Sequence, residues 1–240
     1  MEAKINRILI CSGPLMVLMF LTGFLVFAGW IPPSDPADQA TDVVGRYAAN
    51  PNGIMFGMVL AMIGSALLTP WGVAISGSLN RIKGVRPLAE VQKLSSTIGA
   101  LTFIIPLTLW IGAGYRYNGR SADVTQVLQD IGWLQFVCVV WVVFIQMIAI
   151  GWAILADRGG DPVLPHWVGY LNLWAAAGVF PAGLVPFFHS GPFAWNGAVG
   201  FFVPLVSFCV WMLTTSWAVF TELNRRIASE DRGGQPADQS

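Results

Sequence analysis

The chain has 240 residues, of which 55% are hydrophobic and only 11% are charged. Soluble domains average about 45–50% apolar and about 25% charged residues, so the composition excludes an ordinary soluble domain and indicates an integral membrane protein with several spans. The thirteen basic and thirteen acidic residues balance to a formal net charge of zero. There is therefore no basic excess to favour nucleic acid as a partner, and the expected surroundings are the lipid bilayer.

The fold class that we expect is an all-α membrane protein, a bundle of six transmembrane helices within one domain over residues 1–223. Each apolar segment is long enough to cross a hydrocarbon core of about 30 Å. The first is too long for a cleaved signal peptide, whose apolar run covers about 7–15 residues. The polar residues 224–240 predict a disordered tail. The six segments are residues 8–30, 53–79, 94–115, 131–156, 167–188 and 193–220.

Basic residues predict the orientation, because cytoplasmic loops retain Lys and Arg. With both termini in the cytoplasm, only Arg46, Arg116 and Arg120 of the thirteen basic residues lie outside. We therefore expect a multi-pass protein of the plasma (inner) membrane. The cytoplasmic loop 80–93 carries four basic residues and one acidic residue, so it should contact anionic lipid headgroups.

Two outer connections read as helical. The first, residues 31–52, predicts a short amphipathic surface helix that is capped by Ser34 or Asp35 and ended by Asn50. A connector resting on lipid or on the bundle is favoured over a gating lid. The second predicts a helix that starts at Ser121 and runs straight into the fourth span.

The second span carries small residues at four-residue spacing, which is typical of close helix packing. Backbones must approach closely for helices to associate in lipid, and small side chains permit it. The neighbour could be another span of the chain, a second copy or another membrane protein. This ridge consists of Gly53, Gly57, Ala61 and Ser65.

The apolar segments contain no Asp, Glu, Lys, Arg or His, which argues against proton relays and ion-coupled sites at depth. His166 and His189 stand at opposite ends of the fifth segment, and the three cysteines lie at different depths, so we expect no metal site and no cofactor. His189 is a weak catalytic candidate, because outer carboxylates could assist it, although a helix-capping or solvated histidine is the commoner case. Those carboxylates are Asp35, Asp38, Asp42, Asp123 and Asp130.

Short motifs recur in the two halves of the chain. A Pro-x-Gly step starts at Pro70 and at Pro181, and Phe-x-x-Pro-Leu contains Pro106 and Pro204. They could reflect a weak 3+3 inverted repeat, although chance is the commoner explanation in a composition rich in Gly and Pro. If the repeat holds, the second, third, fifth and sixth helices enclose an uncharged cavity near the midplane. Candidate ligand-binding residues are Asn172, Gln146, Thr108, Trp71, Trp110 and Trp174.

Three classes of function fit these observations. The first is a non-catalytic accessory or interaction component of a membrane assembly, which the small-residue ridge favours. The second is a carrier or binder of uncharged lipophilic small molecules, which the paired prolines favour. The third is a membrane enzyme that uses His189 and the outer carboxylates. We order them in this way and lean against an enzyme.

Overall fold

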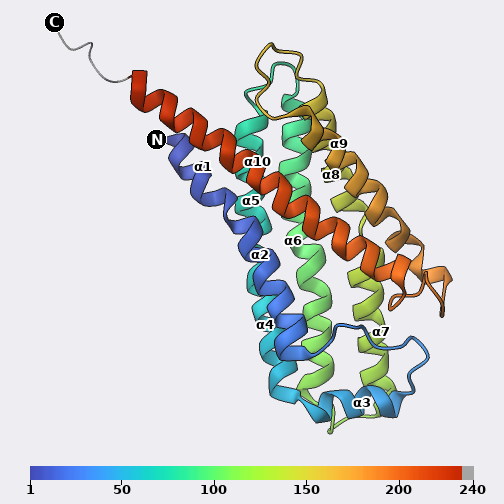
Figure 1. Cartoon of the computed structure of the whole chain (residues 1–240). Helices are drawn as coiled ribbons and strands as arrows, with labels where there is room; N and C mark the ends of the chain where they lie inside the picture. Colours follow the sequence, from blue (N-terminus) through green and yellow to red (C-terminus); the bar gives the residue numbers. More distant parts are fainter. Residues whose placement is uncertain (234–240) are drawn as a thin grey trace, which may run out of the picture.

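The computed structural model describes the backbone of residues 1–233 and the side chains of residues 1–230. Over this part of the chain the regular structure is entirely helical, and six helical stretches are long and apolar enough to cross a membrane. The predicted class, an all-α protein with six membrane-length helices, is confirmed. Both termini lie at one end of the bundle and the short helix α3 lies at the other (Figure 1). We call these ends the terminal face and the α3 face.

Each stretch is named as a span. Span 1 joins α1 (Glu2–Ile10), α2 (Ser12–Leu21) and the π-helix η1 (Thr22–Ala28); span 2 joins α4 (Pro51–Ala66) and α5 (Leu68–Leu79); span 3 is α6 (Arg86–Tyr115); span 4 joins α7 (Ala122–Cys138) and α8 (Trp141–Leu155); span 5 joins α9 (His166–Val179) and the 3₁₀-helix η2 (Phe180–Phe187); span 6 joins the π-helix η3 (Ala198–Phe202) and α10 (Val203–Gly233). Most helices extend past the predicted apolar segments, because polar turns continue them into the headgroup layers.

Span 6 continues further than the sequence indicated. Helix α10 runs on to Gly233, into the segment from residue 224 that was expected to be disordered, and residues 234–240 lie outside the described part of the chain. Leu223 and Ile227 remain buried against the bundle, and Arg226 pairs with Glu230 one turn further on. Apolar burial and an i,i+4 ion pair together stabilise these added turns.

The outer connection between spans 1 and 2 contains a helix, as predicted, but the helix starts later. Helix α3 spans Ala40–Ala49, and its N-cap is Gln39 rather than Ser34 or Asp35. The Gln39 side chain and the Asp42 carboxylate form a reciprocal capping box, which satisfies backbone N–H groups that would otherwise lack partners. Ser121, in contrast, is the N-cap of α7 as expected.

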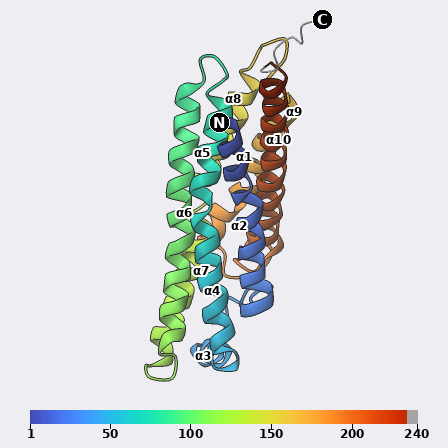
Figure 2. The ribbon, with the colours of Figure 1, turned by 90° about the vertical axis from the view of Figure 1, so that its left-hand side faces the viewer.

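Span 1 lies between span 2 and span 6 (Figure 2). Its closest approach to span 2 is at two glycines: a Cβ added to Gly23 would lie only 2.5 Å from the carbonyl oxygen of Gly57. Ala61 and Ser65 are fully buried in the same helix. The small-residue ridge thus packs within the chain, at least around Gly57, and the two backbones meet there because neither residue carries a side chain.

The terminal face holds a buried carboxylate near the end of α10. Glu222 is 4% exposed, accepts a hydrogen bond from the Ser78 hydroxyl at 2.9 Å and pairs with the Arg81 guanidinium. Burial, followed by repulsion from Arg226 and Arg225, lowers the pKa of Arg81 from its ordinary value. The pair ties the end of span 2 to the sixth span, since a buried carboxylate requires a partner.

Candidate functional site

A largely apolar cavity lies within the bundle and is the candidate functional site. Its volume is about 90 Å³. Spans 1, 3, 4, 5 and 6 all contribute to its wall, whereas span 2 does not appear among the lining residues. The wall consists of Met16, Val17, Phe20, Leu21, Thr102, Phe103, Phe136, Val137, Val139, Val140, Val143, Val179, Ala182, Gly200, Phe201, Pro204, Leu205, Phe208 and Cys209.

The cavity lies where several spans depart from regular α-helix. In span 4 the helix breaks between α7 and α8 at Val139 and Val140, and both residues line the cavity. The break needs no proline. Val139, Val140, Val142 and Val143 are β-branched and lose side-chain freedom against a preceding helical turn, which lowers the preference of this stretch for the helix.

Spans 5 and 6 break beside the same cavity for a different reason. Pro181 and Pro186 lie in η2, and a proline has no N–H to donate to the preceding turn, so the chain continues as a tighter 3₁₀-helix. Span 6 enters as the π-helix η3 just before Pro204. The cavity lining includes Ala182 from η2 and Phe201 from η3, so irregular backbone surrounds the space.

The proline pairs of the proposed repeat differ in local structure. Pro106 lies inside the continuous helix α6, and Pro70 lies in the first turn of α5, after span 2 is interrupted at Leu67. In contrast, Pro181 lies in a 3₁₀-helix and Pro204 follows a π-helical turn. Of these four prolines, Pro204 lines the cavity. The breaks that shape the space therefore come mainly from the second half of the chain.

The wall offers a ligand almost no polar partner. Thr102 and Cys209 are its only residues with a polar side-chain group, and the Thr102 hydroxyl already donates a 2.7 Å hydrogen bond to the carbonyl oxygen of Gly99 on its own helix. Polar groups of a ligand would be stripped of water here without compensation, which costs about 1–3 kcal/mol for each group. The chemistry of the site fits a hydrocarbon.

Phenylalanine rings form much of this wall. The ring of Phe136 packs on Phe20 at a centroid distance of 5.7 Å and on Phe103 at 5.8 Å, and Phe103 meets Phe208 at 5.5 Å. Four spans are joined through these contacts. Ring edges and faces provide a large contact area for hydrocarbon groups without adding a charge or a strong hydrogen-bonding group.

Tryptophans close the cavity toward the α3 face. Trp133 contacts the cavity residues Phe136 and Phe201 at 6.2 and 6.1 Å. Behind them, the ring of Trp110 lies 4.9 Å from Trp133 and 5.1 Å from Trp30. All three indoles are 5% exposed or less. A layer of indole rings thus separates the cavity from water on this side.

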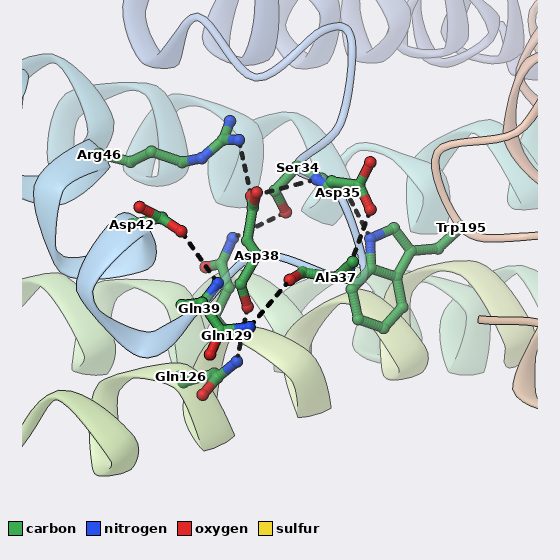
Figure 3. A network of polar contacts seen from close by, with 10 residues as sticks. All are labelled: Ser34, Asp35, Ala37, Asp38, Gln39, Asp42, Arg46, Gln126, Gln129 and Trp195. Carbon is green, nitrogen blue, oxygen red and sulfur yellow. Dashed lines mark hydrogen bonds and ion pairs between the residues drawn. The ribbon is translucent and has the colours of Figure 1, made fainter. Parts of the chain in front are cut away.

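The outer connection 31–49, which we call the cover, contacts the tryptophan layer through the rings of Tyr47 and Trp30. Polar contacts fix the cover (Figure 3). The Trp195 indole donates a 2.8 Å hydrogen bond to the carbonyl oxygen of Ser34. Gln129 of α7 accepts a 2.6 Å hydrogen bond from the Tyr47 hydroxyl, and Gln126 donates to the carbonyl oxygen of Asp38. The cover is therefore held to span 4 and to the connection between spans 5 and 6, and it fits the expected connector resting on the bundle.

Two of the candidate ligand-binding residues join helices instead of lining the cavity. Asn172 is fully buried and accepts a 2.6 Å hydrogen bond from the Trp211 indole, while its amide donates to the carbonyl oxygen of Val168. Trp71 donates a 2.8 Å hydrogen bond to the Ser216 hydroxyl. These contacts connect spans 5 and 2 to span 6, on the terminal side of the cavity.

The other four candidates are also away from the cavity wall. Trp110 is buried in the tryptophan layer and donates to the carbonyl oxygen of Gln129. Gln146 is buried in α8, and its amide nitrogen has no partner in the described structure. Thr108 is exposed and bonds to the preceding turn of its own helix. Trp174 is 58% exposed on the lipid-facing side.

The weak catalytic candidate gains no partner from the structure. His189 is exposed in the turn between spans 5 and 6. The Asp38 carboxylate pairs with Arg46 at 2.7 Å, and Asp42 and Asp35 accept hydrogen bonds from backbone N–H groups of the cover. Among the described residues, no three His, Cys, Asp or Glu side chains come together in a group that could hold a metal ion.

The fold and this site define a multi-pass helical membrane protein that encloses an apolar cavity. Comparison with protein-family models, with curated proteins and with solved structures finds no match for the chain. Its function must therefore be argued from the geometry of the molecule.

Proposed function

We propose that the protein binds an uncharged lipophilic molecule in the cavity among spans 1, 3, 4, 5 and 6. One observation carries this proposal: spans 4, 5 and 6 all depart from regular α-helix around the same largely apolar space. An apolar cavity of this order stays dry and takes up small apolar molecules. Binding pockets of proteins are lined mostly by apolar and aromatic side chains, which agrees with the wall of this cavity.

The accessory-component function has weaker support. Its main argument was the ridge of small residues on span 2, and Gly57 of this ridge packs against Gly23 of the same chain. The ridge therefore leaves little free surface there for a second copy or another membrane protein. A catalytic function through His189 has the least support, because His189 is exposed and three of the five candidate carboxylates, those of Asp35, Asp38 and Asp42, are engaged within the cover.

For the orientation, we propose that the terminal face is cytoplasmic and that the membrane is the plasma (inner) membrane. Basic residues support this, because only three of the thirteen lie in the connections of the α3 face, and cytoplasmic loops are enriched in Lys and Arg. The loop 80–93 would then contact anionic headgroups. Reporter fusions at Gly84 and Asn118 test the orientation, and a fusion at Gly84 that reports the outside would reverse it.

The binding proposal is tested by filling the cavity. Val179 is buried in its wall, so Val179→Phe places a ring in the space that a ligand needs. Val206 is 56% exposed on the lipid-facing side of α10, and Val206→Phe is the matched control. Both variants and the natural protein are purified, washed exhaustively with fresh detergent and extracted, and the extracts are analysed by mass spectrometry.

We expect the natural protein and Val206→Phe to retain about one uncharged lipophilic molecule or lipid per chain. We expect Val179→Phe to lose it while eluting as the same monodisperse species. Equal retention by the two variants, or no retained molecule in the natural protein, would overturn the proposal.

A further inference from the structure

Partly buried residues of spans 1 and 6 form one edge of the cavity. On span 1, Met19 and Gly23 face span 2, and Met16, Phe20 and Val17 line the cavity. Leu21 comes next around the helix; it lines the cavity but is only partly buried. Beyond it, on the side away from span 2, Leu18 and Leu25 are 63% and 48% exposed and face lipid.

Around span 6 the faces follow the same order as around span 1: a neighbouring span, the cavity, the edge of the cavity and then lipid. Ser207, Trp211 and Thr215 face span 5. Pro204 and Phe208 face the cavity, and the partly buried Leu205 and Cys209 lie at its edge on the side of span 1. Val206 and Val210, further around the helix, are 56% and 37% exposed. We call the edge formed by Leu21, Leu205 and Cys209 the lateral opening.

The arrangement of the helices agrees with an opening at this position. Helices α2 and α10 diverge toward the α3 face (Figure 1). Their close packing is nearer the terminal face, where a Cβ added to Gly13 would lie 2.8 Å from the Ser216 hydroxyl oxygen. Toward water the cavity is covered by the layer of Trp133, Trp110 and Trp30.

We infer that the occupant of the cavity is an acyl chain of a bilayer phospholipid, which enters through the lateral opening while its headgroup stays at the membrane surface. This inference rests on the proposed binding function and specifies the ligand and its route. Acyl chains are the most concentrated apolar groups at the opening, and besides the weakly polar Cys209 thiol and the Thr102 hydroxyl, which is bonded to its own helix, the wall has no polar side chain that would select a more polar ligand. The cavity of about 90 Å³ is smaller than the cavity of about 150 Å³ that takes up benzene, so it holds a short stretch of a flexible chain rather than the whole chain.

The test uses nanodiscs of phosphatidylcholine that carry a photoreactive diazirine at the middle of one acyl chain. After illumination, the labelled positions are mapped by peptide mass spectrometry. We expect adducts on cavity residues that are buried from the outer surface, Val179 and Phe201, in addition to lipid-facing residues such as Leu213. Adducts confined to lipid-facing residues would overturn the inference.

Variants of the lateral opening supply a second measurement. Leu205→Trp narrows the opening, whereas Leu213→Trp adds the same ring at a lipid-facing position of the same helix that is 45% exposed. We expect Leu205→Trp to lower labelling of Phe201 about tenfold and Leu213→Trp to leave it unchanged. Cys209→Phe should also lower the labelling of Phe201, because it narrows the same opening. If one of the two variants fails to fold, the other still gives the result.

A photoreactive free fatty acid of the same chain length separates the two sources of an acyl chain. Labelling of the cavity by the free acid and not by phosphatidylcholine would overturn the phospholipid assignment. If a retained uncharged molecule disappears in Val179→Phe while phosphatidylcholine labels only the outer surface, the binding function stands and this inference fails. If neither effect is seen, both fail.

Discussion

Asn172 accepts a 2.6 Å hydrogen bond from the Trp211 indole, and both side chains are fully buried between spans 5 and 6. An amide in an apolar segment can bind a ligand or join helices, and here its carbonyl oxygen and amide nitrogen are both engaged by the protein. Hydrogen bonds of this kind between membrane helices contribute about 0.6–2 kcal/mol. Asn172 therefore stabilises the hairpin of spans 5 and 6.

Replacing Asn172 tests this role. Asn172→Leu leaves the Trp211 N–H without an acceptor, so we expect the free energy of unfolding in mixed micelles to fall by about 1–2 kcal/mol. The retained lipophilic molecule should remain, because Asn172 does not line the cavity. Thr108→Val is the control, since Thr108 is exposed and bonds only to its own helix. If Asn172→Leu is as stable as the natural protein but no longer retains the molecule, Asn172 is a ligand-binding residue and this interpretation is wrong.

Substitution of Gly57 tests the contact between spans 1 and 2. Gly57→Ala places a methyl group against the backbone at Gly23, and backbone cannot move aside as a flexible side chain can. We expect a loss of about 1–3 kcal/mol in the free energy of unfolding. Gly112→Ala is the matched control in α6, where an added Cβ meets nothing within 4 Å. Equal melting temperatures of the two variants would contradict the close contact.

Tyr47 predicts a dependence of stability on alkaline pH. Burial raises the pKa of its phenol well above the ordinary value, whereas the unfolded chain should titrate near pH 10. The folded state favours the neutral phenol, so this contribution to stability is fully present below about pH 10 and is lost as the pH rises above it. We expect Tyr47→Phe to be less stable at neutral pH by about 1 kcal/mol, because its hydrogen bond to Gln129 is lost.

The measurement is the free energy of unfolding of the natural protein and of Tyr47→Phe between about pH 8 and about pH 11. The difference between these two free energies of unfolding should shrink as the pH rises. A constant difference would mean that Tyr47 titrates alike in the folded and unfolded states.

The hydrogen bond of Trp195 should slow local opening of the cover. Trp195→Phe keeps an aromatic ring but removes the N–H that donates to the carbonyl oxygen of Ser34. We expect backbone amides in residues 33–39 to exchange hydrogen about tenfold faster, the effect of about 1.4 kcal/mol on local opening. Trp174→Phe, at an exposed position of α9, should leave the exchange unchanged. Unchanged exchange in Trp195→Phe would show that the remaining contacts of Gln126 and Gln129 hold the cover alone.

The number and class of the spans could be predicted because long apolar runs have few alternatives in a bilayer. The boundaries were less accurate, since polar turns such as the one with Arg226 and Glu230 extend a helix without adding apolar residues. The start of α3 was missed because Gln39 and Asp42 cap the helix together, and glutamine is an uncommon N-cap.

The cavity wall was harder to predict than the cavity itself. Proline was the signal used. It drew attention to Pro106, which the continuous helix α6 accommodates, and to Pro70, which follows an interruption of span 2 away from the cavity wall. The break at Val139 and Val140 had a sequence signal, a run of β-branched residues, that was not used. Polar candidates such as Asn172 were chosen because polar residues in lipid are costly, yet a hydrocarbon site is lined by residues that resemble ordinary core.

The hydrogen bond between Trp195 and Ser34 joins positions separated by 161 residues, and this separation has a consequence for biosynthesis. The ribosome releases the cover long before it makes α7 or the turn ahead of span 6, so the cover has no surface to settle on while the first three spans enter the membrane. The cover can reach its final position only when the last hairpin arrives. Assembly of the α3 face therefore depends on a residue that is made late in synthesis.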